Sequence, residues 1–195
     1  MMRSESAVIK ENKINKADTP TLNTIRKMRA RIRNIKEIKS FLFRLIILIG
    51  FLGLLFYGMF GLYAVPNEEM IPRISPGDLL LVFRIGDSFT VDDIIVYQAG
   101  GTKHVGRVVA KEGDTVEIKA EGGLYINDNY KVEKEIYFDT FAYEDYVEYP
   151  VTLEEGQYFI LTDNRESALD SRYYGPVSKQ QIVGKVISLM RRGKL

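Results

Sequence analysis

The stretch of residues 65–78 reads VPNEEMIPRISPGD and joins two apolar segments of different kinds. Before it runs an uncharged stretch of 21 residues, Leu45 to Val65, and after it comes the branched segment from Asp78 to Ile85. An uncharged helix of that length spans about 30 Å, the thickness of a bilayer's hydrocarbon core. The sequence therefore predicts a single transmembrane helix at residues 45–65, followed by a folded domain at residues 66–195.

The net charge of +1 conceals an uneven distribution of charge. Residues 1–44 carry 12 Lys and Arg against 4 Asp and Glu, a net charge of +8, and the other residues carry 15 against 22, a net charge of −7. Because basic residues gather on the cytoplasmic side of a membrane span, we expect a cytoplasmic basic tail at residues 1–44 and an extracellular C-terminal domain. The basic residues accompany no nucleic-acid-binding motif, so we expect no nucleic-acid partner.

The tail divides into two parts by its pattern. Residues 1–22 are polar and aperiodic, which is typical of a disordered segment. From Ile25 to Leu42, apolar residues recur at helical spacing among Lys and Arg. This second part is either an amphipathic helix along the inner leaflet or a helix that extends the anchor into the cytosol.

The domain after the predicted anchor has the pattern of a mainly β protein. Short runs of branched and aromatic residues alternate with turn residues, as at Gly113-Asp114 and Gly122-Gly123. We expect strands at residues 78–85, 94–97, 104–110, 115–119, 124–126, 158–161 and 182–189. The chain contains no Cys, so no disulfide supports the domain, which fits a Gram-positive cell surface. The sequence has no metal-ligand cluster and no cofactor motif, so we expect neither a metal nor a cofactor.

Residues 70–78 carry a Met-x-Pro element and a Pro-Gly-Asp element. They resemble the nucleophile segment of type I signal peptidases, which generally reads Ser-Met-x-Pro and then Gly-Asp. In that family the serine hydroxyl attacks the scissile carbonyl and forms an acyl-enzyme. Here Glu69 precedes Met70, and a carboxylate of low basicity cannot act as that nucleophile.

The segment from Lys103 to Asp114, KHVGRVVAKEGD, resembles the lysine segment of the same family. The shared residues align Gly106 with the neutral lysine that accepts the proton of the serine. Lys103 should point away from that face of the strand, because side chains alternate. His104 shares the face of Gly106, about 6 to 7 Å along the strand. A lone His beside a turn is more often a solvated surface residue, and we expect His104 to be one.

Residues 158–177, YFILTDNRESALDSRYYGPV, give the most specific match. Family members carry Gly-Asp-Asn-Arg, then Ser-x-Asp-Ser-Arg and a nearby Gly, and the residues in register are Asp163, Asn164, Arg165, Asp170, Ser171, Arg172 and Gly175. We expect structural roles for them: an ion pair between Asp170 and Arg172, and turn hydrogen bonds from Asp163 and Asn164. Thr162 replaces the family's glycine. Ala168 stands where the family has a serine hydroxyl that helps to orient the lysine, and Ser167 is one residue out of register.

The resemblance covers residues 40–186 and implies a signal-peptidase-like β domain in which Glu69 and Gly106 replace the catalytic pair. The chain also resembles the signal-peptidase-like proteins of the SipA type that are encoded with sortase-assembled pili in streptococci. Some of those proteins lack the catalytic pair and act in pilus assembly. The resemblance thus implies a pseudo-peptidase in the cell membrane that acts as a chaperone or assembly factor, with pilin subunits, a sortase or both as partners. The oligomeric state is left open.

Two surfaces are candidates for binding a partner. An extended segment can pair with a free strand edge without any nucleophile, and we expect a groove lined by Glu69, Met70, Ile71, Pro72, Leu79, Leu81 and Phe83. Glu69 either favours a basic peptide there or blocks the old site. In residues 133–149, acidic residues alternate with Tyr137, Phe138, Phe141, Tyr143, Tyr146 and Tyr149. These rings either form an exposed interface or pack on the domain while the acidic residues face water.

An active membrane-bound protease with an unconventional catalytic group is the alternative function. Glu69 would be its general base, with His104 or Ser75 recruited. A third possibility, a plain membrane anchor, predicts no partner at all. Cleavage of a precursor that is abolished by Glu69→Gln would identify the protease.

Overall fold

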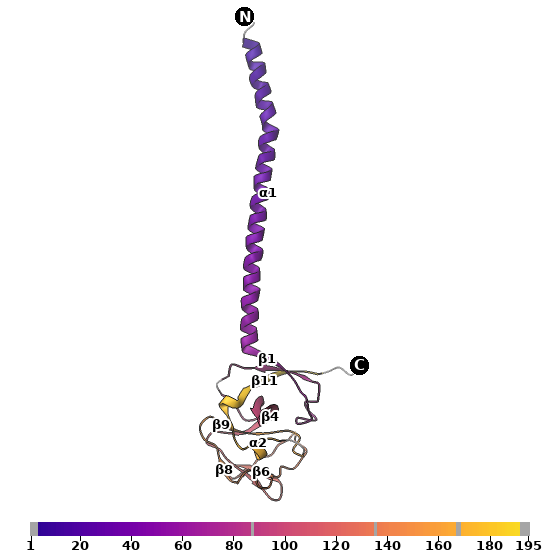
Figure 1. The fold of residues 1–195 in the computed structure, drawn as a ribbon, viewed down its shortest axis with the longest axis vertical. Helices are drawn as coiled ribbons and strands as arrows, with labels where there is room; N and C mark the ends of the chain where they lie inside the picture. The colour runs from indigo at the N-terminus through magenta and orange to yellow at the C-terminus, as the bar shows by residue number, and fades with distance from the viewer. Residues whose placement is uncertain (1–3, 87, 135, 167–168, 192–195) are drawn as a thin grey trace. The chain divides into compact units, whose positions relative to one another are not determined.

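The computed structural model of the chain describes residues 4–86, 88–134, 136–166 and 169–191 (Figure 1). The chain divides into two compact units, residues 1–55 and residues 56–195. The first unit is the greater part of one helix, and the second is built mainly of strands.

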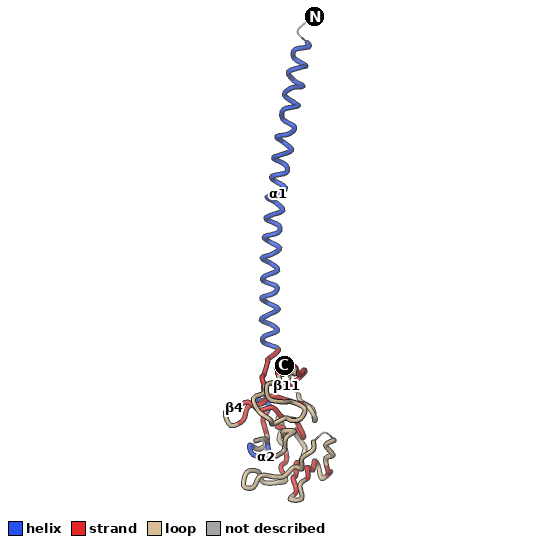
Figure 2. Tube along the Cα trace, turned by 90° about the vertical axis from the view of Figure 1, so that its right-hand side faces the viewer, coloured by secondary structure: helices blue, strands red, loops and turns tan. Residues whose placement is uncertain are grey.

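Helix α1, Ser4–Met59, is the first element of the chain (Figure 2). From Thr24 to Met59 it is long and apolar enough to cross a membrane; by length and composition alone, a signal sequence near the N-terminus would meet the same criterion. The helix starts at Ser4, so it contains most of the segment that we predicted to be disordered. Ala, Lys and Glu are frequent in residues 4–18, and all three favour helix.

The apolar helix was predicted to run to Val65, and this boundary is wrong. Helix α1 ends at Met59, and β1, Phe60–Ala64, follows directly. Every residue of β1 pairs with β2, Leu79–Phe83, in antiparallel register. Backbone groups are satisfied by a neighbouring strand as fully as by a helix, and an apolar run does not by itself distinguish the two.

The strands of the second unit form two sheets in which every pair is antiparallel. The seven-stranded sheet has the order β1-β2-β11-β3-β4-β9-β10, with β3 at Ile94–Ala99, β4 at Thr102–Lys111, β9 at Gln157–Leu161, β10 at Val177–Ser178 and β11 at Ile182–Met190. The four-stranded sheet has the order β7-β6-β5-β8, with β5 at Thr115–Lys119, β6 at Gly123–Ile126, β7 at Asn129–Tyr130 and β8 at Val151–Thr152. Two short helical segments, α2 at Ser171–Tyr174 and a 3-10 turn at Lys179–Gln181, lie between strands of the larger sheet.

The prediction of a mainly β domain is confirmed. Each of the seven predicted strands corresponds to an observed strand, and the predicted segment 115–119 has the observed bounds of β5. The pattern missed β1 and the two-residue strands β7, β8 and β10, as well as α2. A strand of two residues has too few side chains to show an alternation.

The core of the larger sheet is divided between its two faces. Ile95, Tyr97 and Val108 lie in one buried cluster, and Val96 and Val105 lie in another. The loop of residues 65–78, between β1 and β2, contributes Val65, Met70 and Ile74 to the second cluster, where all three are at most 2% exposed. The loop is therefore part of the core, and its backbone has a fixed position beside the sheet.

Candidate functional site

Glu69 lies in the loop between β1 and β2, and hydrogen bonds hold this loop at both ends. At its base, the backbone N–H of Val65 donates to the carbonyl of Asp78 at 2.9 Å. At its tip, the backbone N–H of Asn164 donates to the carbonyl of Glu69 at 2.9 Å, and Asn164 Nδ2 donates to the carbonyl of Glu68 at 3.2 Å. We had expected Asn164 to stabilise only its own turn, but it also fixes the backbone that carries Glu69.

His104, on β4, contacts Glu69 directly. Its Nδ1 lies 2.9 Å from Glu69 Oε1, and its Nε2 lies 2.8 Å from Thr102 Oγ1. The rings of Tyr97 and Tyr174 lie against the imidazole, each with its centroid 5.6 Å away. His104 is only 7% exposed, so the prediction of a solvated histidine is wrong. Strand alternation gave its face correctly, but the position of the loop that brings Glu69 to it could not be read from the sequence.

Two proton arrangements satisfy these contacts. A neutral His104 with its proton on Nδ1 donates to Glu69 and accepts from the Thr102 hydroxyl. An imidazolium donates to both neighbours, and Thr102 Oγ1 then donates to the carbonyl of Ala99, 3.3 Å away. The pair of Glu69 and His104 carries a net negative charge in the first arrangement and no net charge in the second.

The site contains polar atoms without a partner. Glu69 is 9% exposed, and among the described residues its Oε2 has no hydrogen-bond partner; the same holds for the hydroxyl of Tyr97, which is fully buried. Burial raises the pKa of Tyr97 well above its usual range, and the charges of Asp170 and Glu69 raise it further. Burial also raises the pKa of Tyr63, with a contribution from Glu69. The charge of Glu69 therefore acts on the phenols of Tyr97 and Tyr63.

Gly106 lies on the same face of β4, in a space that other side chains fill. A Cβ atom at this position would lie 2.5 Å from Ile160 Cγ2, 3.2 Å from the carbonyl oxygen of Leu161 and 3.3 Å from Tyr97 Cε1. Non-bonded carbon atoms do not approach each other to 2.5 Å, so even the methyl group of alanine would displace Ile160. The position that the resemblance gives to the general-base lysine has no room for one.

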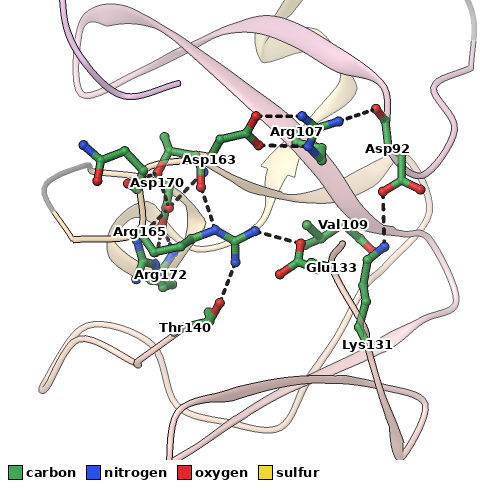
Figure 3. A network of polar contacts seen from close by, with 12 residues as sticks. Asp92, Arg107, Val109, Lys131, Glu133, Thr140, Asp163, Arg165, Asp170 and Arg172 are labelled. Atoms are coloured by element: carbon green, nitrogen blue, oxygen red, sulfur yellow. Dashed lines mark hydrogen bonds and ion pairs between the residues drawn. The ribbon is translucent and has the colours of Figure 1, made fainter. Parts of the chain in front are cut away.

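The segment that follows β9 holds the site through buried ion pairs (Figure 3). Arg107 donates from Nε and Nη2 to the two carboxylate oxygens of Asp163, at 2.9 and 2.7 Å. Arg165, which is 2% exposed, donates to Thr140 Oγ1 at 2.6 Å and to Glu133 at 2.8 Å. Figure 3 shows that these pairs tie β4 to the segments 131–140 and 163–165.

Asp170 and Arg172 form a second buried unit beside them. Arg172 donates from Nε and Nη2 to the carboxylate of Asp170, at 2.9 and 3.0 Å, and both residues are at most 1% exposed. Asp170 also accepts from the backbone N–H and the hydroxyl of Thr162, at 3.1 and 3.0 Å. Thr162 thus uses its hydroxyl within the framework. Ser167 and Ala168 lie outside the described residues.

The predicted groove residues do not share one open surface. Met70 is fully buried in the core, and Leu79, Leu81 and Phe83 lie on β2, which is paired with β1 on one side and with β11 on the other. Strand β2 therefore has no free edge to which a peptide could be added, and Met70 cannot line a groove. Pro72 is exposed and Ile71 is partly exposed.

Besides β10 at the opposite end of the same sheet, free main-chain edges are found on β1 and on part of β4 among the described strands. Within the described residues, β1 pairs only with β2, and the part of β4 from Thr102 to Gly106 pairs only with β3, because β9 begins to pair with β4 at Arg107. The two edges are linked by the hydroxyl of Tyr63, which donates to the carbonyl of Lys103 at 2.9 Å. Glu69 and His104 lie beside the β4 edge.

In the acidic and aromatic segment, residues 133–149, some rings are exposed and others pack on the domain. Tyr137, Phe141 and Tyr146 are 78%, 49% and 55% exposed. The other three rings are partly buried: Tyr149 packs against Phe159, the guanidinium of Arg172 lies over the ring of Tyr143, and Phe138 lines a small pocket with Leu124. Three of the six rings are therefore exposed. Across the described parts of the chain, no group of three His, Cys, Asp or Glu side chains could hold a metal ion.

Comparison with known proteins identifies relatives over most of the chain. The family description "Signal peptidase, peptidase S26" matches residues 38–190. The chain is 30% identical over 139 residues to "Probable thylakoidal processing peptidase 2, chloroplastic" of Arabidopsis thaliana, which is 64% of this chain and 36% of that protein. The chain therefore spans little more than a third of the length of this relative.

Two bacterial relatives match over more of their own length. "Probable signal peptidase I-1" of Synechocystis sp. is 28% identical over 136 residues, 63% of this chain and 67% of that protein. "Inactive signal peptidase IA" of Staphylococcus aureus is 26% identical over 133 residues, 64% of this chain and 75% of that protein. The crystal structure of a signal peptidase I from Enterococcus faecalis V583 aligns with a TM-score of 0.42 and 28% identity, covering 52% of this chain and 98% of that chain.

Proposed function

Because the chain belongs to the signal peptidase family, peptidase S26, we propose that it keeps the family's scaffold without the hydrolytic chemistry and acts as a chaperone or assembly factor. The observation that carries this proposal is the closed space at Gly106, where a Cβ atom would lie 2.5 Å from Ile160 Cγ2. A serine hydroxyl needs a base beside it, and the position of that base is filled by core side chains. The nucleophile position is Glu69, which has no hydroxyl. The inactive signal peptidase among the relatives supports the same conclusion.

The chaperone binds an extended segment of its partner by main-chain pairing. Such pairing needs only a strand edge that no other strand occupies, which β1 and the Thr102–Gly106 part of β4 provide within the described chain. The hydrogen bonds of Asn164 to the loop of Glu69 keep this region rigid, so little conformational entropy is lost on binding. The exposed rings of Tyr137, Phe141 and Tyr146 provide a second contact surface, since aromatic rings bury a large area at low entropic cost.

The partners are pilin subunits, a sortase or both, and the chain acts at the cell membrane. The partners follow from the resemblance to signal-peptidase-like proteins encoded with sortase-assembled pili. The membrane location is supported by helix α1, whose segment Thr24–Met59 is long and apolar enough to cross a membrane. The net charge of +8 before residue 45 orients it with the N-terminus in the cytoplasm and the β domain outside.

One observation favours a second candidate, a hydrolase with new chemistry. Thr102 Oγ1, His104 and Glu69 lie at successive distances of 2.8 and 2.9 Å, which is the order of nucleophile, base and orienting carboxylate in a catalytic triad. Thr102 is exposed, and a hydroxyl there could be activated by His104. The two candidates differ in the effect of Thr102→Val: the hydrolase loses all cleavage, whereas the chaperone keeps its partner.

The pairing mode is tested with peptides and the full-length chain in lipid nanodiscs. An extended peptide from a pilin should bind with micromolar affinity by calorimetry, and the same peptide N-methylated at alternate backbone nitrogens should lose at least tenfold, because its hydrogen bonds to the strand edge are removed. Equal affinity of the two peptides would exclude main-chain pairing. Absence of binding by pilin, sortase and peptide alike would leave only the plain anchor.

A further inference from the structure

The partnerless oxygen of Glu69 identifies the chemistry of the ligand at this site. Glu69 Oε1 is occupied by His104 Nδ1 at 2.9 Å, whereas Oε2 is buried and has no hydrogen-bond partner among the described residues. A buried carboxylate oxygen without a donor is costly, and native structures generally supply one. The missing partner is therefore a donor, and a positively charged one is favoured because the neutral form of His104 leaves the charge of Glu69 uncompensated.

A second partnerless group belongs to a ring that packs on His104. The hydroxyl of Tyr97 is fully buried, has no partner within the described part of the chain, and belongs to the ring that packs on His104 with a centroid distance of 5.6 Å. A phenol oxygen can accept a hydrogen bond from a cation, and aromatic rings attract cations through their faces. Tyr174 places a further ring on His104, also at 5.6 Å.

The geometry of Glu69 distinguishes an ammonium group from a guanidinium. Arginine binds carboxylates best through two parallel hydrogen bonds, which require both oxygens. Here one oxygen is already occupied by His104, so the paired geometry is not available. An ammonium group is a compact point charge with three donors, and it can bind a single carboxylate oxygen together with a phenol oxygen.

Resting on the proposed function, we infer that the site beside the β4 edge selects a partner segment that carries a lysine side chain, whose ammonium group binds Glu69 Oε2 and the hydroxyl of Tyr97. Glutamate at residue 69 then has a function of its own. It has no hydroxyl for peptide hydrolysis, but its carboxylate provides the counter-charge for the lysine of the ligand. The backbone of the segment pairs with the strand edge, and the lysine fixes its register along that edge.

The test uses the full-length chain in nanodiscs and capped octapeptides of Ala, Ser and Val with a single variable position moved along the peptide. In one register, we expect the peptide with Lys to bind at least tenfold more tightly than the peptide with norleucine, which has the same methylene chain and no charge, and more tightly than the peptide with Arg. Glu69→Gln should reduce the difference between Lys and norleucine to less than twofold. Glu68→Gln is the matched control, because it removes the same charge from the neighbouring exposed residue and should keep the preference.

Each outcome bears on one of the two proposals. Equal binding of Lys and norleucine peptides in every register would overturn the lysine inference and leave the pairing groove in place. Absence of binding by any octapeptide would overturn the groove and the inference with it. If Glu69→Gln does not fold, Tyr97→Phe gives an independent test, since it removes only the hydroxyl and should weaken the Lys peptide but not the norleucine peptide.

Discussion

Buried charges are found in two neighbouring regions of this domain, and their surroundings differ. In the segment 162–172, Asp163 is paired with Arg107, Arg165 with Glu133, and Asp170 with Arg172. Glu69 is nearly as buried, but its neighbour is a histidine, and one of its oxygens has no partner among the described residues. The first arrangement stabilises the fold because each charge has its counter-charge. The second leaves a charge available to a ligand, as expected of a binding site rather than of a framework.

The largest effect should come from removing a framework carboxylate. Asp170→Asn removes the charge that Arg172 faces while Arg172 remains 1% exposed, so we expect a loss of about 3–5 kcal/mol in the free energy of unfolding. Urea unfolding of the full chain in detergent, followed by the near-UV circular dichroism of its tyrosines, measures it. The exposed Asp139 provides the control, and Asp139→Asn should change stability by less than about 0.5 kcal/mol. A loss of under 1 kcal/mol in Asp170→Asn would contradict the role of the framework.

Gly106→Ala tests the closed base position and should have the second largest effect. Its Cβ would overlap Ile160, and overpacking of a core costs about 1–3 kcal/mol. Gly86→Ala is the matched control, because its Cβ would meet its nearest neighbour only at 4.0 Å. In a double-mutant cycle, Ile160→Ala should relieve part of the cost of Gly106→Ala, and additive effects of the two substitutions would contradict the overlap.

Glu69→Gln should have a smaller effect on stability than either of these changes. The amide oxygen of Gln can still accept from His104, and the substitution removes a buried charge that lacks full compensation. At pH 8 we expect the free energy of unfolding to change by less than about 1 kcal/mol, or to rise. A loss as large as that of Asp170→Asn would place Glu69 in the framework and remove the contrast between the two regions.

The smallest effect concerns a surface pair outside both regions. Burial tends to raise the pKa of Asp93, but hydrogen bonds from Lys185, at 2.6 Å, and from Thr90 outweigh it and lower the pKa. A carboxyl whose pKa is lowered in the folded state contributes stability above its unfolded pKa of about 3.9, and the contribution disappears as the pH falls through the folded pKa. Asp93→Asn should therefore be less stable than the wild type at pH 7 and equally stable near pH 2. A difference independent of pH would contradict this assignment.

The larger strands and the framework residues were readable from the sequence, because their signals are local. Alternation and turn residues gave the seven predicted strands, though not β1, and the motif of residues 163–172 singled out the residues of the buried pairs. The partners of those pairs were not all predicted. Arg107 and Glu133 are far from Asp163 and Arg165 in the sequence, and no local pattern indicates which distant charge a buried residue faces.

The sequence analysis missed those features of the site that depend on tertiary contacts. Glu69 and Gly106 were identified as replacements, but His104 was assigned to the surface and Met70 to a groove. The residue types of the loop 65–78 do not show that its apolar residues pack on the sheet. Nor do they show that the carboxylate of Glu69 reaches His104 on β4. The helix end at Met59 was missed for a similar reason, since β1 exists only because β2 lies beside it.

Cleavage and binding on one sample test the central claim most directly. The full-length chain in nanodiscs is mixed with a secretory precursor and with a pilin, mass spectrometry follows the length of each, and calorimetry follows association. We predict association with the pilin while both substrates stay intact. Cleavage of either substrate that disappears in Glu69→Gln or Thr102→Val would contradict the account and make the chain a peptidase with new chemistry.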